Sequence, residues 1–288
     1  MQFVQATKFK SKLRLLIEGL SGSGKTWSSL LMAAGLGGKI AVIDSENGSS
    51  AAYKNNFDFD LLVLEAPFSS TKYIEAIHLA EKGGYDTIII DSISHEWNGE
   101  GGCIDMHSKI EGNSYTAWAK ITPLHNKFIQ VMLASKCHII ATARTKSDVV
   151  MQEGTNKRGS KIQIPKKVGM KAEQRDGLDY EFTTVLRLDN NNTFEATKDR
   201  SGIFKDKLGE TLTSEYATSI LSWLEDGEDK PDINALIKDI LAGDLGYEDV
   251  MAKFRDMHSN AKNVADKQLI KEAADNLKSL TLVSVKEA

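Results

Sequence analysis

Gly19-Leu20-Ser21-Gly22-Ser23-Gly24-Lys25-Thr26 is the stretch that decides the fold of this chain. It has the pattern G-x-x-x-x-G-K-[ST], which forms a phosphate-binding loop when a buried strand precedes it and a helix follows it. Both are predicted here, because residues 13–17 form an apolar run and residues 27–34 are expected to be helical. The glycines let backbone N–H groups turn toward a phosphate, and the helix N-terminus adds its positive end to the site.

The residue types of this loop predict ATP and Mg²⁺ as ligands. Lys25 is expected to reach the β- and γ-phosphates, and the Thr26 hydroxyl is expected to ligate Mg²⁺. The alternative is a glycine-rich turn that binds no nucleotide, which the flanking strand and helix argue against. The residues expected to bind the nucleotide are Gly19, Ser21, Gly22, Ser23, Gly24, Lys25 and Thr26.

The composition is that of an ordinary soluble globular protein, since 41% of the residues are hydrophobic and 26% are charged. The formal net charge of -4 predicts no overall attraction to nucleic acid, so a basic site must be local. Cys103 and Cys137 do not make a disulfide framework, which favours a reducing environment. The sequence shows neither a secretion signal nor an apolar run of about 18 residues, so we expect no membrane association and a cytoplasmic location.

Further apolar runs are predicted to be strands of one sheet. They alternate with helical patterns, which is typical of a mostly parallel sheet covered on both faces and gives the fold class α/β. The predicted helices cover residues 70–82 and 115–134, with an interruption near Pro123. The predicted strands after the first cover residues 39–44, 61–64, 85–92 and 138–144.

Charged residues follow the carboxyl ends of these strands, where ligands of parallel sheets bind. They are Glu46, Glu65, Asp91 and Arg144. Asp91 closes an apolar strand downstream of the phosphate loop, so its carboxylate is expected to hold Mg²⁺ opposite Thr26.

The segment 145–176 shows no apolar periodicity and is predicted to be a long loop. Its cations outnumber its acidic residues in an acidic chain, so it is the natural place for a nucleic-acid backbone to bind. The alternative is a solvated, mobile loop. The segment contains no aromatic residue, so base stacking is not expected there. Its cations are Lys146, Lys157, Arg158, Lys161, Lys166, Lys167, Lys171 and Arg175.

The remaining chain predicts a β-hairpin and a small helical unit. Two alternating runs, 180–188 and 193–200, flank an Asn-rich turn. A helix near 214–224 is expected to close the core. The predicted organisation is a core over 1–225, an acidic linker over 226–232 and a helical C-terminal unit over 233–288.

A zinc site is not predicted. Cys103 and His107 are four residues apart and can share a helix face, but a zinc ion needs about four converging ligands. No G-x-S-x-G motif opens a helix, so no nucleophilic serine is expected. The four tryptophans are expected to have packing or interface roles, and Trp97 is the one to test for stacking on bases.

The order of these parts resembles the RecA-like ATPase core. It is more closely similar to the phage ATPases of that superfamily that act as single-strand annealing recombination proteins. The resemblance covers residues from about 10 to 225 and is carried by residues 22–26, Ile43-Asp44-Ser45-Glu46, Ile89-Ile90-Asp91-Ser92, Arg144 and the hairpin ending Lys198-Asp199-Arg200. It implies an ATP-hydrolysing protein that binds single-stranded DNA in phage recombination or annealing, in the cytoplasm of a bacterial host.

The resemblance also implies roles for individual residues. The long loop would face DNA through Lys157, Arg158, Lys161, Lys166 and Lys167, and residues 92–112, which are Gly-rich but not basic, would occupy a second DNA-facing position. The paired cations Lys198 and Arg200 would reach the γ-phosphate in a neighbouring subunit, which requires a homo-oligomer with ATP at the interface.

The catalytic residues are assigned by the same resemblance. Glu46 is expected to orient the attacking water, because hexameric helicases of the superfamily carry their glutamate at the end of the second strand. Glu65 and then Glu96 are the further candidates. Arg144 is expected to sense the γ-phosphate, and its alternative role is that of a surface arginine at a strand end.

Other functions stay open at this point. A hexameric helicase-like DNA motor has the same core, and a nucleotide-switched scaffold would show little turnover and bind a partner through its C-terminal helices. A small-molecule kinase is disfavoured, because paired cations stand where an acceptor lid would be expected. RNA is an alternative ligand to DNA, and a single-strand-binding protein is a further candidate partner.

Overall fold

The computed structural model describes residues 5–155, 161–229, 233–243, 245–261 and 264–284. The chain divides into two compact units. One is Ser11–Asp226, and the other combines Met1–Lys10 with Gly227–Ala288.

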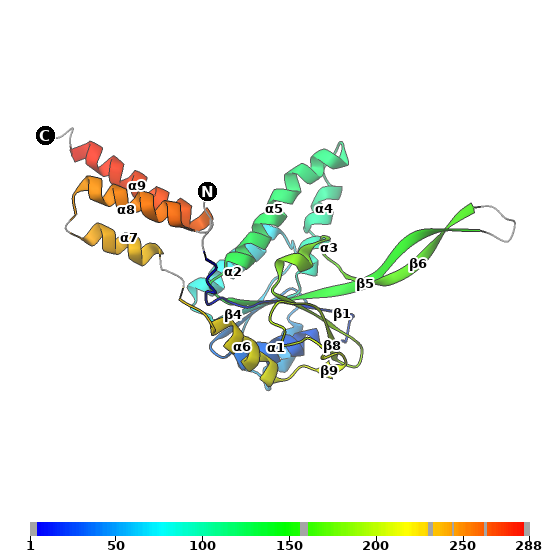
Figure 1. Ribbon diagram of the computed structural model, residues 1–288. Coiled ribbons are helices and arrows are strands. Elements are labelled where there is room, and N and C mark those ends of the chain that lie inside the picture. The colour runs from blue at the N-terminus through cyan, green and yellow to red at the C-terminus, as the bar shows by residue number, and fades with distance from the viewer. Residues whose placement is uncertain (1–4, 156–160, 230–232, 244, 262–263, 285–288) are drawn as a thin grey trace. The chain divides into compact units, whose positions relative to one another are not determined.

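The larger unit is built on one sheet with the strand order β3-β2-β4-β5-β1-β7-β8-β9 (Figure 1). Every pair of neighbouring strands in this order is parallel as far as β7, and β8 and β9 add an antiparallel edge. The expected α/β class, with a mostly parallel sheet and a late hairpin of β7 and β8, is therefore confirmed. The strands are β1 Arg14–Gly19, β2 Ile40–Asp44, β3 Asp60–Val63, β4 Thr87–Asp91, β5 His138–Thr155, β6 Lys161–Ala172, β7 Thr184–Leu188, β8 Thr193–Asp199 and β9 Glu210–Thr211.

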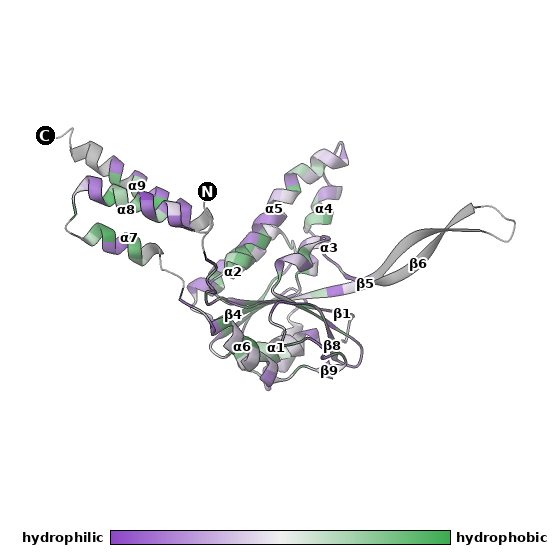
Figure 2. Cartoon of the chain, in the orientation of Figure 1, coloured by the Kyte–Doolittle hydropathy of each residue, from purple (hydrophilic) through white to green (hydrophobic). Residues whose placement is uncertain are grey.

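Helices cover both faces of this sheet. Because side chains alternate along a strand, Ile88 and Ile90 of β4 enter one apolar core while Ile89 enters the other. The first core contains buried residues of α2 (Ser70–Lys82) and α5 (Ser114–Ala134). The second contains residues of α1 (Lys25–Leu36) and α6 (Ser214–Glu225). In Figure 2 the hydrophobic colour of α5 gathers along the half of the helix nearest the sheet.

The parallel register brings the carboxyl ends of the central strands to one edge. Gly19, the last residue of β1, is level with Arg144 of β5, and Asp44 of β2 is level with Asp91 of β4. The phosphate loop, Glu46 and Asp91 therefore start from neighbouring positions on the sheet.

The prediction of a long loop over 145–176 is wrong. The fifth strand does not end at Arg144 but continues to Thr155, and it pairs with β6 in an antiparallel hairpin from Thr145↔Ala172 to Thr155↔Lys161. This hairpin projects from the sheet in Figure 1. Its order comes from backbone pairing, which requires no apolar periodicity, so the sequence pattern does not reveal it.

Two further expectations need correction. Helix α5 runs without interruption through Pro123, because its other hydrogen bonds and its packing outweigh the one donor that proline removes. Residues 92–112 are not a plain loop but contain α3 (Ser94–Asn98) and α4 (Cys103–Ser108). Short one-turn helices (3₁₀) are present at Ser49–Tyr53 and Leu178–Glu181.

The smaller unit contains the helices α7 (Ile233–Ala242), α8 (Tyr247–Asn260) and α9 (Val264–Ser284). They pack around a core of Val250, Met251, Phe254 and Ile270. Phe9, near the start of the chain, forms a parallel bridge with Glu228. Among the described residues, no helix has the length and apolar character needed to cross a membrane.

Candidate active site

The phosphate loop connects β1 to α1, and its glycines are there for geometric reasons. Gly22 and Gly24 have φ values of 79° and 83°, in the left-handed region that favours glycine, and Gly24 caps the N-terminus of α1. A Cβ at Gly19 would lie 2.2 Å from Ser23 Oγ and 3.0 Å from the Leu188 carbonyl oxygen, so a larger residue would force neighbouring groups to shift. Ser23 is buried and Ser21 is exposed. The backbone thus has the form of an anion-binding loop at a helix N-terminus.

Lys25 lies within this loop. Its Nζ donates to the Leu20 carbonyl at 2.8 Å. Burial lowers the pKa of Lys25, while the carboxylates of Asp91 and Glu46 oppose that shift. The ammonium group is therefore held in a partly desolvated place where a phosphate would interact with it more strongly than in water.

Asp91 and Thr26 make the site for a divalent cation. Thr26 Oγ1 donates to Asp91 Oδ2 at 2.5 Å, and Thr142 Oγ1 donates to Asp91 Oδ1 at 2.6 Å. Asp91 is 2% exposed, and burial raises its pKa. A buried carboxylate beside hydroxyl oxygens is a hard donor set that suits Mg²⁺. The residues present therefore fit the cation that the sequence predicts, and Thr142 is an addition that the sequence pattern does not indicate.

Asp44 fixes the turn that carries Glu46. This buried carboxylate accepts hydrogen bonds from the backbone N–H groups of Glu46 at 2.6 Å, Gly48 at 3.2 Å and Ser50 at 2.8 Å. The motifs in the sequence do not by themselves assign this role to Asp44. A carboxylate followed by Asn-Gly is a turn signal, and it is the feature from which this role can be anticipated.

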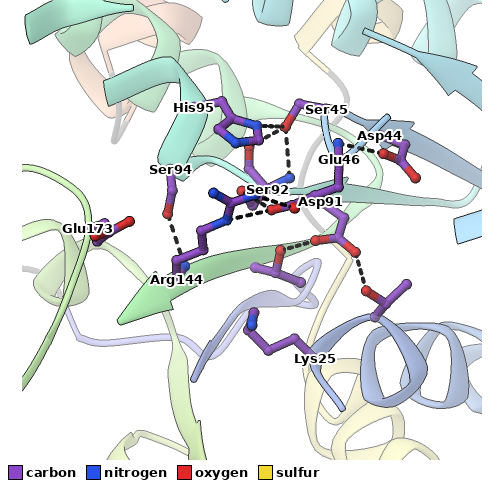
Figure 3. A network of polar contacts seen from close by, with 12 residues as sticks. Lys25, Asp44, Ser45, Glu46, Asp91, Ser92, Ser94, His95, Arg144 and Glu173 are labelled. Atoms are coloured by element: carbon purple, nitrogen blue, oxygen red, sulfur yellow. Dashed lines mark hydrogen bonds and ion pairs between the residues drawn. The ribbon is translucent and has the colours of Figure 1, made fainter. Parts of the chain in front are cut away.

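Glu46 and Arg144 form an ion pair above Asp91 (Figure 3). Arg144 Nε donates to Glu46 Oε1 at 2.9 Å, Arg144 Nη2 contacts Oε2, and Ser92 Oγ donates to Oε1 at 3.1 Å. Burial raises the pKa of Glu46, but the hydrogen bonds and the charge of Arg144 lower this pKa by a larger amount, so the net shift is downward. The hydrogen bonds with Glu46 in turn raise the pKa of Arg144. Both groups are therefore charged at neutral pH.

Arg144 also belongs to the base of the hairpin. Its backbone N–H donates to Ser94 Oγ at 2.9 Å, and its carbonyl accepts from the Glu173 N–H at 2.6 Å. Glu173 directly follows β6. One residue therefore contacts the candidate catalytic carboxylate, α3 and the returning end of the hairpin.

The other candidate glutamates lie elsewhere. Glu65 is exposed beyond β3, which is the edge strand of the sheet. Glu96 is fully buried in α3, where its carboxylate contacts Ser70, Cys103, His125 and Gln174. Of the candidate glutamates, Glu46 is the one that lies beside Asp91.

Lys198 and Arg200 are not at this edge of the sheet. Lys198 pairs with Val185 near the start of β7, and β7 is parallel to β1, so the end of β8 lies at the edge opposite the phosphate loop. Lys198 Nζ donates to the carbonyls of Asp179 at 3.0 Å and Tyr180 at 2.5 Å. Arg200 is exposed. These cations do not serve the phosphate loop of their own chain.

The other end of the same hairpin does reach the loop. A Cβ at Gly24 would lie 2.8 Å from Asn192 Oδ1, so the turn between β7 and β8 packs against the phosphate loop. Asn192 has a positive φ of 62° and is exposed. The sequence predicts this turn but gives no sign that it lies beside the loop.

The predicted nucleic-acid contacts are only partly described. Lys157 and Arg158 lie outside the described residues. Lys161, Lys166 and Lys167 are in β6, where their backbones pair with Thr155, Val150 and Val149. Their side chains are also outside what the structure describes.

The larger unit matches a known protein family. A family model described as an AAA domain matches residues 11–209, which lie in the larger unit. A comparison with curated proteins gives no match. The family match agrees with the phosphate loop and cation site in supporting nucleotide binding and hydrolysis.

Proposed function

Because this chain belongs to the AAA domain family of P-loop ATPases, we propose that it hydrolyses ATP as a homo-oligomer bound to single-stranded DNA, in phage recombination or strand annealing. The observation that carries the ATPase part is the meeting of four groups at one sheet edge. They are Lys25, Thr26, Asp91 and Glu46.

Each of these groups has a part in the reaction. Thr26 and Asp91 would hold Mg²⁺, which supplies charge neutralisation to the β- and γ-phosphates when bound. Lys25 places positive charge on the same oxygens. Glu46 orients a water for in-line attack on the γ-phosphorus and accepts its proton. A bond forms from the water oxygen to that phosphorus while the bond from the phosphorus to the bridging oxygen breaks, and ADP and phosphate leave. Arg144, which donates to Glu46, would sense the γ-phosphate.

The position of the hairpin supports the DNA part of the proposal. The hairpin begins directly after Arg144, and its segment carries more cations than acidic residues. Cations that neutralise backbone phosphates release condensed counterions, so binding through them weakens steeply as salt rises.

The position of Lys198 and Arg200 supports an oligomer. They lie at the sheet edge opposite the phosphate loop, so they would complete an ATP site only in another copy of the chain. A head-to-tail arrangement of copies presents one edge to the opposite edge of the next copy, as this requires.

Mixing two inactive variants tests the shared site. Lys25→Ala and Arg200→Ala proteins are each expected to lose ATP turnover. When they are mixed in equal amounts, about a quarter of the head-to-tail interfaces would combine an intact phosphate loop with an intact Arg200, so about a quarter of the wild-type rate should return. If Arg200→Ala protein alone turns over ATP at the wild-type rate, the shared site is wrong.

The DNA proposal is tested by ATP hydrolysis with and without single-stranded DNA at low salt. We expect DNA to increase the rate of ATP hydrolysis by wild-type protein. It should not increase the rate of the variant Lys161→Ala/Lys166→Ala/Lys167→Ala. The slope of log K for DNA binding against log salt is negative, and in this variant its magnitude should be smaller by up to about 2. Each single-strand phosphate contact contributes about 0.7 to that magnitude. The matched control removes the same charge from the exposed lysines Lys39, Lys82 and Lys205 and should keep both properties.

Other outcomes of that experiment overturn the proposal in identifiable ways. ATP-driven strand separation would indicate a helicase-like motor. ATP turnover that is slow in wild-type protein and in every variant, and that does not change when DNA is added, would indicate a nucleotide-switched scaffold. Stimulation of ATP hydrolysis by RNA and not by DNA would show that RNA is the nucleic acid that the protein binds.

A further inference from the structure

A second group of chemically active side chains is buried away from the phosphate site. Glu96, Cys103 and His125 come from α3, α4 and α5, and their exposures are 0%, 0% and 3%. One potential ligand atom from each lies within 4.8 Å of those of the other two. The family match and the proposed ATPase reaction leave this cluster without a role.

The contacts of the cluster centre on the carboxylate of Glu96. Cys103 Sγ lies 3.2 Å from Glu96 Oε1, and His125 Nδ1 lies 3.1 Å from Oε2. Ser70 Oγ lies 2.5 Å from Oε1 and 3.8 Å from the sulfur of Cys103. Gln174 Nε2 donates to Oε2 at 3.3 Å and to the Ile93 carbonyl at 2.9 Å, which fixes the outer side of the carboxylate.

These separations are close to those of a tetrahedral zinc site. Zinc bonds of about 2.0–2.3 Å to oxygen, nitrogen and sulfur place the ligand atoms about 3.4–3.6 Å apart. The distances of 3.2 Å to Cys103 Sγ and 3.1 Å to His125 Nδ1 need to grow by only a few tenths of an ångström. Small rotations of the side chains would supply that change. The Ser70 hydroxyl, 2.5 Å from Glu96 Oε1, needs a larger movement of about 1 Å, which rotation about its Cα–Cβ bond can supply.

The types of ligand also select the ion. Imidazole and thiolate favour Zn²⁺ over Mg²⁺ or Ca²⁺, which prefer oxygen. A carboxylate, a thiolate and a neutral imidazole together carry two negative charges, so a divalent ion makes the buried group neutral. Burying a charge without such compensation is costly.

We propose that Glu96, Cys103 and His125 bind one Zn²⁺ ion, with the Ser70 hydroxyl oxygen at the fourth position. On binding, the thiol of Cys103 releases its proton to solvent and His125 binds through Nδ1 as the neutral ring. The ion joins α3, α4 and α5 to the start of α2, and Gln174 connects Glu96 to the segment that follows β6. Its role is structural, because the phosphate site is complete without it.

The metal content of the full chain tests this proposal. Protein is purified without chelator from cells grown with added zinc, and the metal is measured by mass spectrometry. Wild-type protein should contain about one zinc per chain, and Cys103→Ala protein should contain almost none. Cys137→Ala is the matched control, because Cys137 is also buried but donates to the Tyr85 carbonyl at 2.9 Å, outside the cluster. It should keep its zinc.

Cobalt titration of chelator-treated full chain gives a second measurement that does not depend on a variant folding. Wild-type and Cys137→Ala proteins should develop the charge-transfer absorption of a cobalt–thiolate bond. The Mg²⁺ site contains no thiol and cannot produce that band. Wild-type protein that carries no zinc and develops no cobalt–thiolate band overturns the proposal and makes the cluster a metal-free hydrogen-bonded group. A band that persists in Cys103→Ala protein also overturns it.

Discussion

Lys25→Ala protein is expected to lose ATP turnover by about 100-fold or more while keeping its fold. Removing one preorganised positive donor from a transition state typically costs about 10²–10³ in kcat. Here the donor sits partly buried between Asp91, Glu46 and the backbone of the loop, where its charge is poorly screened. Steady-state phosphate release measures the rate, and circular dichroism checks the fold.

The control for that change is Lys54→Ala. Lys54 forms an ion pair with Asp58 at 2.6 Å, and both side chains are well exposed. Exposed pairs of this kind are worth about 0–1 kcal/mol, so turnover should stay at the wild-type rate. Equal turnover by Lys25→Ala and wild-type protein would mean that the phosphate loop does not catalyse hydrolysis.

Glu46→Gln is expected to lower kcat by about 10²–10⁴-fold and to leave ATP binding in place. The amide keeps the shape of the side chain, and its oxygen can accept from Arg144 Nε and Ser92 Oγ. Its NH₂ group cannot accept from Arg144 Nη2, and the amide cannot take a proton from water. Arg144 lowers the pKa of Glu46, so the carboxylate stays ionised as pH falls from about 8 to about 6, and no loss of turnover should come from Glu46 in that range. Stopped-flow binding of a fluorescent ATP analogue, beside a pH series of kcat, measures both parts.

Glu65→Gln separates the candidate glutamates. Glu65 is exposed at the edge strand, so its amide variant should turn over ATP normally. Loss of turnover in Glu65→Gln with normal turnover in Glu46→Gln would move the water-activating role to Glu65.

The central part of the site could be predicted because its sequence signals are local. The phosphate loop needs glycine at Gly22 and Gly24 for a left-handed backbone, and Asp91 closes a strand whose apolar run is continuous. The parallel register then follows from the fold class, so the meeting of Thr26 and Asp91 could be expected. The strand pattern puts Glu46 at this edge and the resemblance gives it a role, but its ion pair with Arg144 is visible only once the strands are aligned.

The parts that sequence did not predict depend on pairing and contacts that no local pattern marks. The β5–β6 hairpin is defined by its backbone pairing, from Thr145↔Ala172 to Thr155↔Lys161. The position of Asn192 beside Gly24 depends on how β7 lies against β1. Glu96, Cys103 and His125 are far enough apart in the sequence that none of the usual metal-ligand spacings applies.

In mechanical terms, strand β5 is a lever arm that begins inside the phosphate site. Arg144 contacts Glu46, and the same strand continues to Thr155, at most about 37 Å away at ~3.4 Å per residue, with a register shift between Asp148 and Val149. A tilt of about 5° at Arg144 therefore moves the far end of the strand by about 3 Å. Such a tilt moves the guanidinium group of Arg144 by less than an ångström. The same tilt displaces the far end of the strand by about the spacing between adjacent residues.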